Sequence, residues 1–319
     1  MDNTGSPSVP LAAAALALSL ALASSAASAS TLTVYAAGTL AVPFHRIDRA
    51  FEHAHPGVTV KGEFGGSVMM ARRIANLHQR ADVYAAAAYG VIPRVLGKAN
   101  LADWYIGFAS NAATLAYTPQ SKGASHIGPH NWYKVVSKPG VVIGRSNPDT
   151  DPSGYQFLQM LSLASRYYHD PGLKKQVLAN APKSAIRDTE TALISALQTG
   201  QIDYLAIYSS SAKSHHLRYV KLPNRINLSR PADAAYYKHG VAHTSKGVLH
   251  GAPLIYGVTI PQNAPSTKLG QEYINFLMGP QGRKIMAQSG FGTFTKPWAQ
   301  GMAHMPDSLR DHVRPWGSS

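Results

Sequence analysis

Three short segments of this 319-residue chain have the residue types that bind a small oxyanion. Gly38-Thr39 and Gly66-Ser67 each join a predicted strand to a predicted helix, and Asp151-Pro152-Ser153 begins another helix. Glycine lets the backbone approach a ligand, and free N–H groups at a helix start donate hydrogen bonds to an anion. However, Asp151 and Glu190 both stand at predicted helix starts and carry carboxylates, which repel an oxyanion. This conflict disappears if the ligand contains a central metal atom that accepts carboxylate oxygens.

Each of these residues also has an ordinary structural explanation. Thr39 and Ser67 are typical N-caps, and acidic residues such as Asp151 and Glu190 favour helix N-termini through the helix dipole. Tyr208 ends a buried strand, where it either donates its phenol O–H to a ligand oxygen or serves as a core tyrosine. Gly38-Thr39 and Gly66-Ser67 both pair a glycine with a hydroxyl residue at a helix start, and both follow the C-terminal end of a strand in the same part of the chain. Two such starts favour a ligand over capping alone.

The composition excludes several classes of function. The chain has no cysteine, which excludes disulfides, thiolate catalysis, iron–sulfur clusters and a lipoprotein anchor. A hydrophobic content of 45% is ample for two lobes with their own cores. The formal net charge is +14, but the only adjacent basic pairs are Arg72-Arg73 and Lys174-Lys175, and no aromatic residues alternate with them. We therefore expect no nucleic-acid binding.

The first 30 residues are typical of a secretory signal. An apolar run from Leu11 to Ala23 is followed by Ala27-Ser28-Ala29, the small-residue pattern that precedes a cleavage site. The start of the segment departs from the pattern, because it holds Asp2 and no Lys or Arg. We expect residues 1–30 to be a signal peptide, and the mature protein to be periplasmic or otherwise extracytoplasmic, without a membrane span.

The remaining chain alternates predicted strands and helices. We expect strands at 31–36, 58–64, 82–88, 112–118, 141–145, 202–208 and 254–260, and helices at 40–53, 68–79, 153–168, 190–199, 267–277 and 281–289. The order of the first elements predicts a parallel sheet with helices on its faces. The strand at 112–118 leaves this unit and the strand at 254–260 returns to it. The sequence thus predicts an α/β protein with lobe 1 at 31–112 and 258–319, lobe 2 at 113–257, and a ligand cleft between them.

Two other residue pairs indicate different chemistry. Tyr236-Tyr237 is the type of pair that supplies phenolate ligands in ferric-ion-binding proteins of the same two-lobe plan, although packing also explains it. His215-His216 could bind a metal, but no HExxH pattern or closely spaced set of histidines and carboxylates accompanies it.

The sequence contains no G-x-S-x-G elbow and no phosphate-binding loop that would argue for an enzyme. Asp149 is expected to form a turn with Asn147-Pro148.

Several stretches of the mature chain resemble the tungstate/molybdate-binding proteins of ABC importers, in particular their archaeal-type branch. They are AAGTLAVPF, FGGSVMMARRI, NWYKVV, NPDTDPSGYQFL, TGQIDYLAIYSSSA, LPNRINL and YGVTIPQNAP. They run through almost the whole mature chain, so the resemblance does not depend on one motif. It implies the type II periplasmic-binding-protein fold, with a cleft between lobes joined by two crossing segments, and no enzymatic activity.

The resemblance also implies roles for donors of hydrogen bonds. Gly38 and Thr39 stand where the family has Gly-Ser in contact with the oxyanion, so Thr39 keeps the hydroxyl and adds a methyl group. Ser67 matches the family's serine after the second strand, and Tyr208 matches its tyrosine. These residues are therefore expected to contact the oxo groups of the ligand.

The same resemblance implies two metal-coordinating carboxylates. Asp151, Pro152 and Ser153 match a segment that is often Asp-Pro-Cys in the family, with serine in place of the cysteine here. Glu190 matches the family's second carboxylate. In that branch the two carboxylates complete a six-coordinate molybdenum or tungsten, a hard centre that prefers oxygen ligands, and we assign that role to Asp151 and Glu190.

The sequence therefore predicts a monomeric binding protein without a cofactor. It is expected to capture tungstate or molybdate and deliver it to the permease and ATPase of an ABC importer. Sulfate is disfavoured because its sulfur does not add carboxylate ligands in this way. The alternatives that stay open are a protein for sulfate or another tetrahedral oxyanion, a ferric-ion-binding protein that uses Tyr236 and Tyr237, and, more distantly, a periplasmic enzyme.

Overall fold

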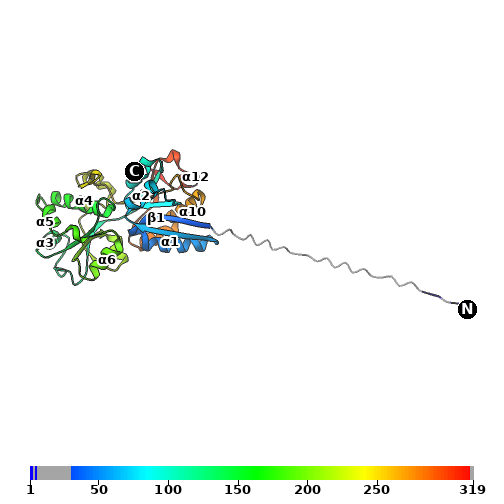
Figure 1. Cartoon of the computed structure of the whole chain (residues 1–319), viewed down its shortest axis with the longest axis horizontal. Helices are drawn as coiled ribbons and strands as arrows, with labels where there is room; N and C mark the ends of the chain where they lie inside the picture. Colours follow the sequence, from blue (N-terminus) through cyan, green and yellow to red (C-terminus); the bar gives the residue numbers. More distant parts are fainter. Residues whose placement is uncertain (3, 6–29, 317–319) are drawn as a thin grey trace.

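The computed structural model describes residues 1–2, 4–5 and 30–316, and most of these residues belong to two α/β bodies that lie side by side (Figure 1). The predicted signal peptide, residues 1–30, lies almost entirely outside the described residues. Among the helices of the described part, none has the length and apolar character of a membrane span. The α/β class that the sequence predicts is confirmed, with one mixed sheet in each body.

The first body contains a seven-stranded sheet and the second a five-stranded sheet. The first sheet has the spatial order β14 (Arg314–Pro315), β13 (Gly292–Gln300), β4 (Tyr105–Ser110), β12 (Ile255–Thr259), β3 (Val83–Ala86), β1 (Ser30–Ala37) and β2 (Val58–Gly65). The second has the order β7 (Ile186–Arg187), β6 (Ile143–Ser146), β8 (Tyr204–Tyr208), β5 (Ala113–Tyr117) and β9 (Arg218–Tyr219). A separate hairpin consists of β10 (Val241–Thr244) and β11 (Gly247–His250).

Twelve α-helices accompany these strands in the described part of the chain. They are α1 (Ala41–Ala54), α2 (Ser67–Asn76), α3 (Trp132–Val136), α4 (Pro152–Tyr167), α5 (Leu173–Ala179), α6 (Glu190–Gln198), α7 (Ser209–Ser214), α8 (Asn224–Asn227), α9 (Ala234–Tyr237), α10 (Thr267–Met278), α11 (Pro280–Gln288) and α12 (Asp307–Arg310). Shorter helical turns include η1 (Gly38–Leu40), η2 (Ile92–Leu96) and η3 (Gly97–Ala99).

Strand β1 shows why the first sheet is covered on both faces. Leu32 and Val34 are fully buried and belong to the core that contains Phe44 and Phe51 of α1. Tyr35 belongs to a second core, together with residues of α2. Because successive side chains of a strand point to opposite faces, α1 and α2 cover opposite sides of the sheet.

Three details differ from the sequence prediction. The first sheet is mixed: β1 pairs in parallel with β2 and β3, and β13 pairs in parallel with β14. The other pairs are antiparallel, because β12 enters from the second body and runs antiparallel to β3 and β4, and β13 runs antiparallel to β4. Helix α2 ends at Asn76 instead of Gln79, since His78 takes a left-handed conformation with φ of 54° and Gln79 N donates to Arg73 O (3.1 Å). The strands that were not predicted are β4, β7, β9, β10, β11, β13 and β14.

The two bodies are joined by two chain segments that lie beside each other. The first passes from β4 to β5 through Asn111, and the second enters β12 through Leu254. Asn111 N donates to Leu254 O (3.0 Å), so the two segments are hydrogen-bonded at the junction. We propose the two sheets as the two lobes. Strand β12 belongs to the first sheet from Ile255, so the predicted boundary at residue 258 falls within this strand.

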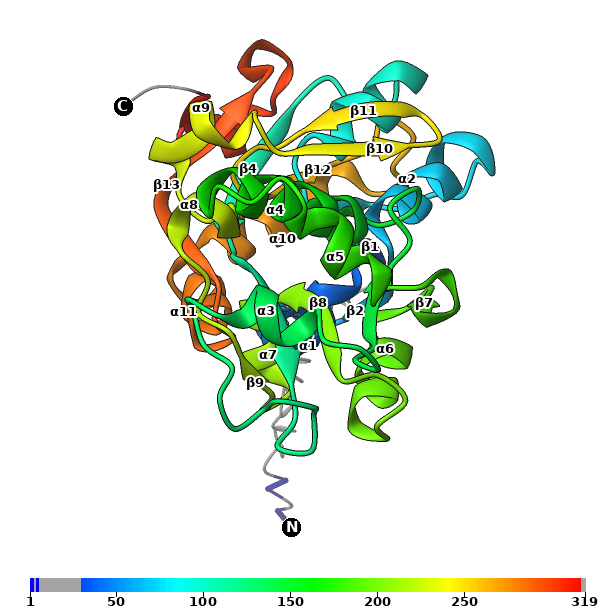
Figure 2. The same cartoon turned by 90° about the vertical axis from the view of Figure 1, so that its left-hand side faces the viewer.

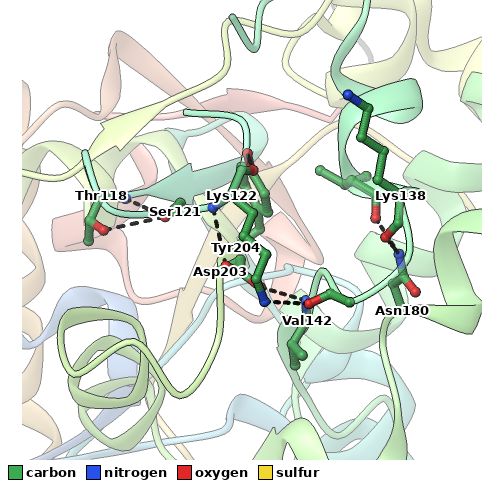
Figure 3. A network of polar contacts seen from close by, with 10 residues as sticks. Thr118, Ser121, Lys122, Lys138, Val142, Asn180, Asp203 and Tyr204 are labelled. Carbon is green, nitrogen blue, oxygen red and sulfur yellow. Dashed lines mark hydrogen bonds and ion pairs between the residues drawn. The ribbon is translucent and has the colours of Figure 1, made fainter. Parts of the chain in front are cut away.

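Polar contacts fix the start of β6 against β8 in the second body (Figure 3). Asp203 accepts hydrogen bonds from Val142 N (2.8 Å) and Lys122 N (3.2 Å), and Tyr204 OH donates to Lys122 O (2.6 Å). The parallel pairing of these two strands therefore has a fixed register. It places the segment after β6, which leads to Asp151, beside the end of β8 at Tyr208.

Candidate functional site

Asp151 is the N-cap of α4, and one of its carboxylate oxygens is used for this role. Asp151 Oδ1 accepts from Ser153 N (2.7 Å) and from the Ser153 hydroxyl (2.7 Å). Among the described residues, Oδ2 has no hydrogen-bond donor, and it faces Gly66 of the first body. Burial raises the pKa of Asp151, while the bonds from Ser153 oppose this shift. Ser153 thus holds the carboxylate so that one oxygen is left for a ligand.

Glu190 is the first residue of α6, whose N-cap is Thr189. Its side chain keeps 16% of its surface exposed, so it is reachable, but it lies deep among protein atoms. This burial raises the pKa of Glu190 to about 7; Ser211 opposes the shift, and the Asp151 carboxylate adds to it. The structure therefore brings the two carboxylates, which are distant in the sequence, close enough to repel each other.

No permanent cation balances this pair among the described residues. Among the described residues, the one basic group within ion-pair distance of either carboxylate is the His215 ring, with Nε2 4.0 Å from Glu190 Oε1. Burial and the neighbouring His216 lower the pKa of His215, so the ring is neutral near pH 7. Two desolvated carboxylates are unfavourable unless they bind protons or an electron-poor centre.

Two glycines of the first body lie close to these acidic residues of the second body. A Cβ added at Gly38 would lie 3.7 Å from the Cβ of Glu190, and one added at Gly66 would lie 3.2 Å from Asp151 Oδ2. The first turn of α2 also donates a hydrogen bond directly to the second body, from Met69 N to Thr150 O (3.2 Å). Asp151 and Glu190 of the second body thus lie beside the glycine-containing helix starts of the first body.

Thr39 belongs to a chain of polar contacts that the sequence reasoning missed. Asn111 Nδ2 donates to the phenol oxygen of Tyr256 (3.1 Å), and this oxygen lies 2.9 Å from Thr39 Oγ1. The Tyr256 proton is then available for Thr39, which leaves the Thr39 hydroxyl free to donate to a ligand. Tyr256 is within the quoted YGVTIPQNAP stretch, but only the packing of β12 beside η1 gives it this role.

Three other predicted ligand contacts have their hydroxyls engaged within the protein. Ser67 is fully buried and its oxygen accepts from Ala87 N (3.0 Å), although its proton remains available. Ser153 donates to Asp151, as described above. The Tyr208 hydroxyl donates to Gln156 Oε1, and its ring lies 6.1 Å from that of Tyr256. In this structure Tyr208 is therefore part of the wall of the site and not a free donor.

Pro152 is the first residue of α4 and is buried; it has no N–H, so it can contribute to the site only through packing. Tyr155, one turn further along α4, receives the guanidinium of Arg94 from the first body, 5.5 Å from its ring centroid. This contact is a further direct link between the two bodies.

The tyrosine pair considered for ferric iron does not form a phenolate site in this structure. Tyr237 is fully buried, and its hydroxyl donates to Asn224 O (2.6 Å) and accepts from Arg230 N (3.1 Å). The Tyr236 ring instead packs under Arg225, at 5.0 Å from the guanidinium carbon. Asp149 forms the predicted turn, with its N–H bonded to Asn147 Oδ1 (3.0 Å).

Two α/β bodies that are joined by two crossing segments, with polar residues where the bodies meet, are typical of a two-lobed binding protein. Residues 32–292 match the family model described as "Bacterial extracellular solute-binding protein", and the chain belongs to this family.

Comparisons with individual proteins agree with this family membership. The chain is 36% identical over 289 residues to an uncharacterized solute-binding protein of Petrotoga mobilis, covering 89% of this chain and 90% of that protein. It is 33% identical over 312 residues to the molybdate/tungstate-binding protein WtpA of Thermococcus kodakarensis, covering 89% and 87%. The periplasmic molybdate-binding protein of Azotobacter vinelandii has a similar fold, with a TM-score of 0.60 at 16% identity over 82% of this chain and 98% of that one. The resemblance and the type II fold predicted from the sequence are thus confirmed.

A methyl group at Gly66 is expected to hold the two bodies apart. The φ and ψ of this residue, −57° and 125°, suit alanine, so Gly66→Ala should not strain the backbone. The new Cβ would lie 2.7 Å from Thr150 O, however, which is too close for the closed arrangement. We expect ligand affinity to fall by about tenfold or more with little change in stability, as measured by calorimetry and thermal unfolding.

Gly90→Ala is the matched control, because a Cβ there meets nothing within 4 Å. Unchanged affinity in Gly66→Ala would mean that ligand binding does not need this close approach.

Proposed function

We propose that this protein captures molybdate or tungstate in the cleft between its two lobes and delivers the anion to the permease of an ABC importer. The observation that carries the proposal is the pair Asp151 and Glu190, two desolvated carboxylates without a balancing cation among the described residues. Both lie beside helix starts of the other lobe, whose N–H groups are hydrogen-bond donors. Such a site repels an ordinary oxyanion but suits one whose central metal binds carboxylate oxygens.

In the proposed complex, the second lobe coordinates the metal of the ligand and the first lobe donates hydrogen bonds to its oxo groups. Asp151 and Glu190 of the second lobe would coordinate the metal of the ligand, adding two oxygens to its four oxo groups. The helix starts at Gly38-Thr39 and Gly66-Ser67 of the first lobe would donate hydrogen bonds to those oxo groups. Because the ligand contacts both lobes, it stabilises the closed arrangement in which they meet.

The relatives support the same ligand class, since the Thermococcus protein of 33% identity is named as a molybdate/tungstate-binding protein. A place outside the cytoplasm follows from the extracellular solute-binding family. We propose the predicted signal peptide as the export route, and the ATPase of the importer as the energy source for uptake. The bound anion is cargo, and the mechanism needs no cofactor.

Calorimetric titration of the ligand-free protein with tungstate, molybdate and sulfate tests the proposal. We expect one tight site for tungstate and for molybdate and no measurable binding of sulfate at the same concentrations. Tight binding of sulfate would favour the tetrahedral-oxyanion alternative. Failure of all three anions would overturn the proposal and direct attention to ferric iron, which a phenolate charge-transfer colour would reveal.

A further inference from the structure

A cavity lies between the two bodies, and neither Asp151 nor Glu190 is among the residues that line it. It has a volume of about 340 Å³ and is lined from the first body by α2 and the η2–η3 segment. From the second body it is lined by the loop before Asp151 and by the hairpin β10–β11. Its size suits a small organic or multi-phosphate anion better than a single tetrahedral oxyanion.

The hairpin that completes this cavity is fastened to the second body. Gln159 Nε2 of α4 donates to Leu249 O (3.2 Å), and the Ser162 hydroxyl donates to Val241 O (2.9 Å). Ser245 N, in the turn of the hairpin, donates to Asp149 Oδ1 (2.8 Å). Figure 2 shows the hairpin lying along α4, with its turn reaching toward α2 of the first body. The hairpin therefore moves with the second body when the lobes open or close.

The cavity is strongly basic. Arg72, Arg94 and Lys98 contribute positive charge from the first body and Lys246 from the second, against the single carboxylate of Asp149. Within the described residues, none of these four cations forms an ion pair with a carboxylate. One oxygen of the Asp149 carboxylate accepts a hydrogen bond from Ser245 N, and this carboxylate can balance only one of the four positive charges. Closing the lobes thus brings like charges from both bodies into one cavity, which is unfavourable without an anion between them.

We propose that this cavity is a second anion-binding site, specific for a small polyanion with phosphate or carboxylate groups, and complete only when the lobes are closed. Its occupant bridges Lys246 of one lobe to the Arg72, Arg94 and Lys98 group of the other. Arg94 also lies over the ring of Tyr155, which is on α4 four residues after Asp151, so this side chain connects the cavity to the helix that begins beside Asp151. Ligands of the two sites both favour closure, and each therefore raises the affinity of the other.

Pyrophosphate is a suitable probe, because it carries several charges and does not coordinate carboxylates. We expect the tungstate-loaded protein to bind one pyrophosphate in low-salt, magnesium-free buffer, without loss of tungstate. Pyrophosphate should in turn tighten tungstate binding by roughly fivefold or more. Lys98→Gln and Lys246→Gln should each weaken pyrophosphate binding by about tenfold, one from each lobe. In the absence of pyrophosphate, both lysine variants should bind tungstate with an affinity within about twofold of the wild-type value.

Lys221→Gln is the matched control, since Lys221 is an exposed lysine of the second body outside the cavity lining. Absence of pyrophosphate binding, displacement of tungstate by pyrophosphate, or an equal loss in Lys221→Gln would each overturn the proposal. The inference does not depend on which oxyanion fills the first site. If tungstate failed to bind, the same pyrophosphate titration of the ligand-free protein and its two lysine variants would still decide it.

Discussion

Replacing Asp151 or Glu190 by alanine should weaken tungstate and molybdate binding by at least about a hundredfold, and replacing both should abolish it. Residues that only support a metal ligand cost about 10- to 100-fold in affinity when removed, so the direct ligands should cost at least as much. The loss corresponds to about 3 kcal/mol or more for each carboxylate. Calorimetry on the three variants measures this directly.

The same variants separate metal coordination from simple anion binding. If the carboxylates only surround the anion, they repel it, and their removal should strengthen the binding of sulfate and tungstate alike. Asp188→Ala is the matched control, because Asp188 is an exposed carboxylate two residues before Glu190. Retained tungstate binding in the double variant would rule out six-fold coordination by these two side chains.

Glu190 should make ligand-free stability and ligand affinity respond to pH in opposite directions. The pKa of Glu190 in the folded protein is raised to about 7 from its ordinary value of 4.5, so the folded state disfavours the charged form. The stability associated with the protonated group is present below the ordinary value and is lost as pH rises toward about 7. The full difference is about 3 kcal/mol, and the remaining exposure of the side chain makes this an upper value.

Coordination of the metal requires the ionised carboxylate, so ligand binding must remove the proton. We therefore expect tungstate affinity to be about tenfold weaker at about pH 6 than at about pH 8, with proton release on binding at the lower pH. Calorimetry in buffers of different ionisation enthalpy measures the number of protons released. Micromolar tungstate keeps the anion monomeric during the titration.

Glu190→Gln isolates the contribution of this single group. The variant should lose tungstate binding, yet without ligand it should be more stable than the wild type near pH 8, by about 1 to 3 kcal/mol. Denaturant unfolding of the two ligand-free proteins at about pH 5 and about pH 8 gives the difference, and the other titrating groups cancel in the comparison. Equal stability of both proteins at both pH values would show that Glu190 is not desolvated.

Much of the fold was predictable from local patterns. The strand expected at 31–36 is β1 (Ser30–Ala37), and the helix expected at 153–168 is α4 (Pro152–Tyr167). The missed strands lack such patterns. Strand β13 contains Pro297, which normally argues against a strand, and β4 contains Gly107 at its centre. These strands exist because the sheet offers them partners on neighbouring segments, and a single local window does not reveal that.

The candidate site was predictable in its residue types but not in their relations. The sequence alone identified Asp151 and Glu190 as carboxylates at helix starts, because capping and the helix dipole act within one turn. Only the tertiary structure brings them together, desolvates them and sets glycines of the other body against them. It alone pairs Thr39 with Tyr256, 217 residues away, and engages the Tyr208 hydroxyl with Gln156. Burial and contacts between distant segments depend on how whole sheets and helices pack, which short-range sequence patterns do not determine.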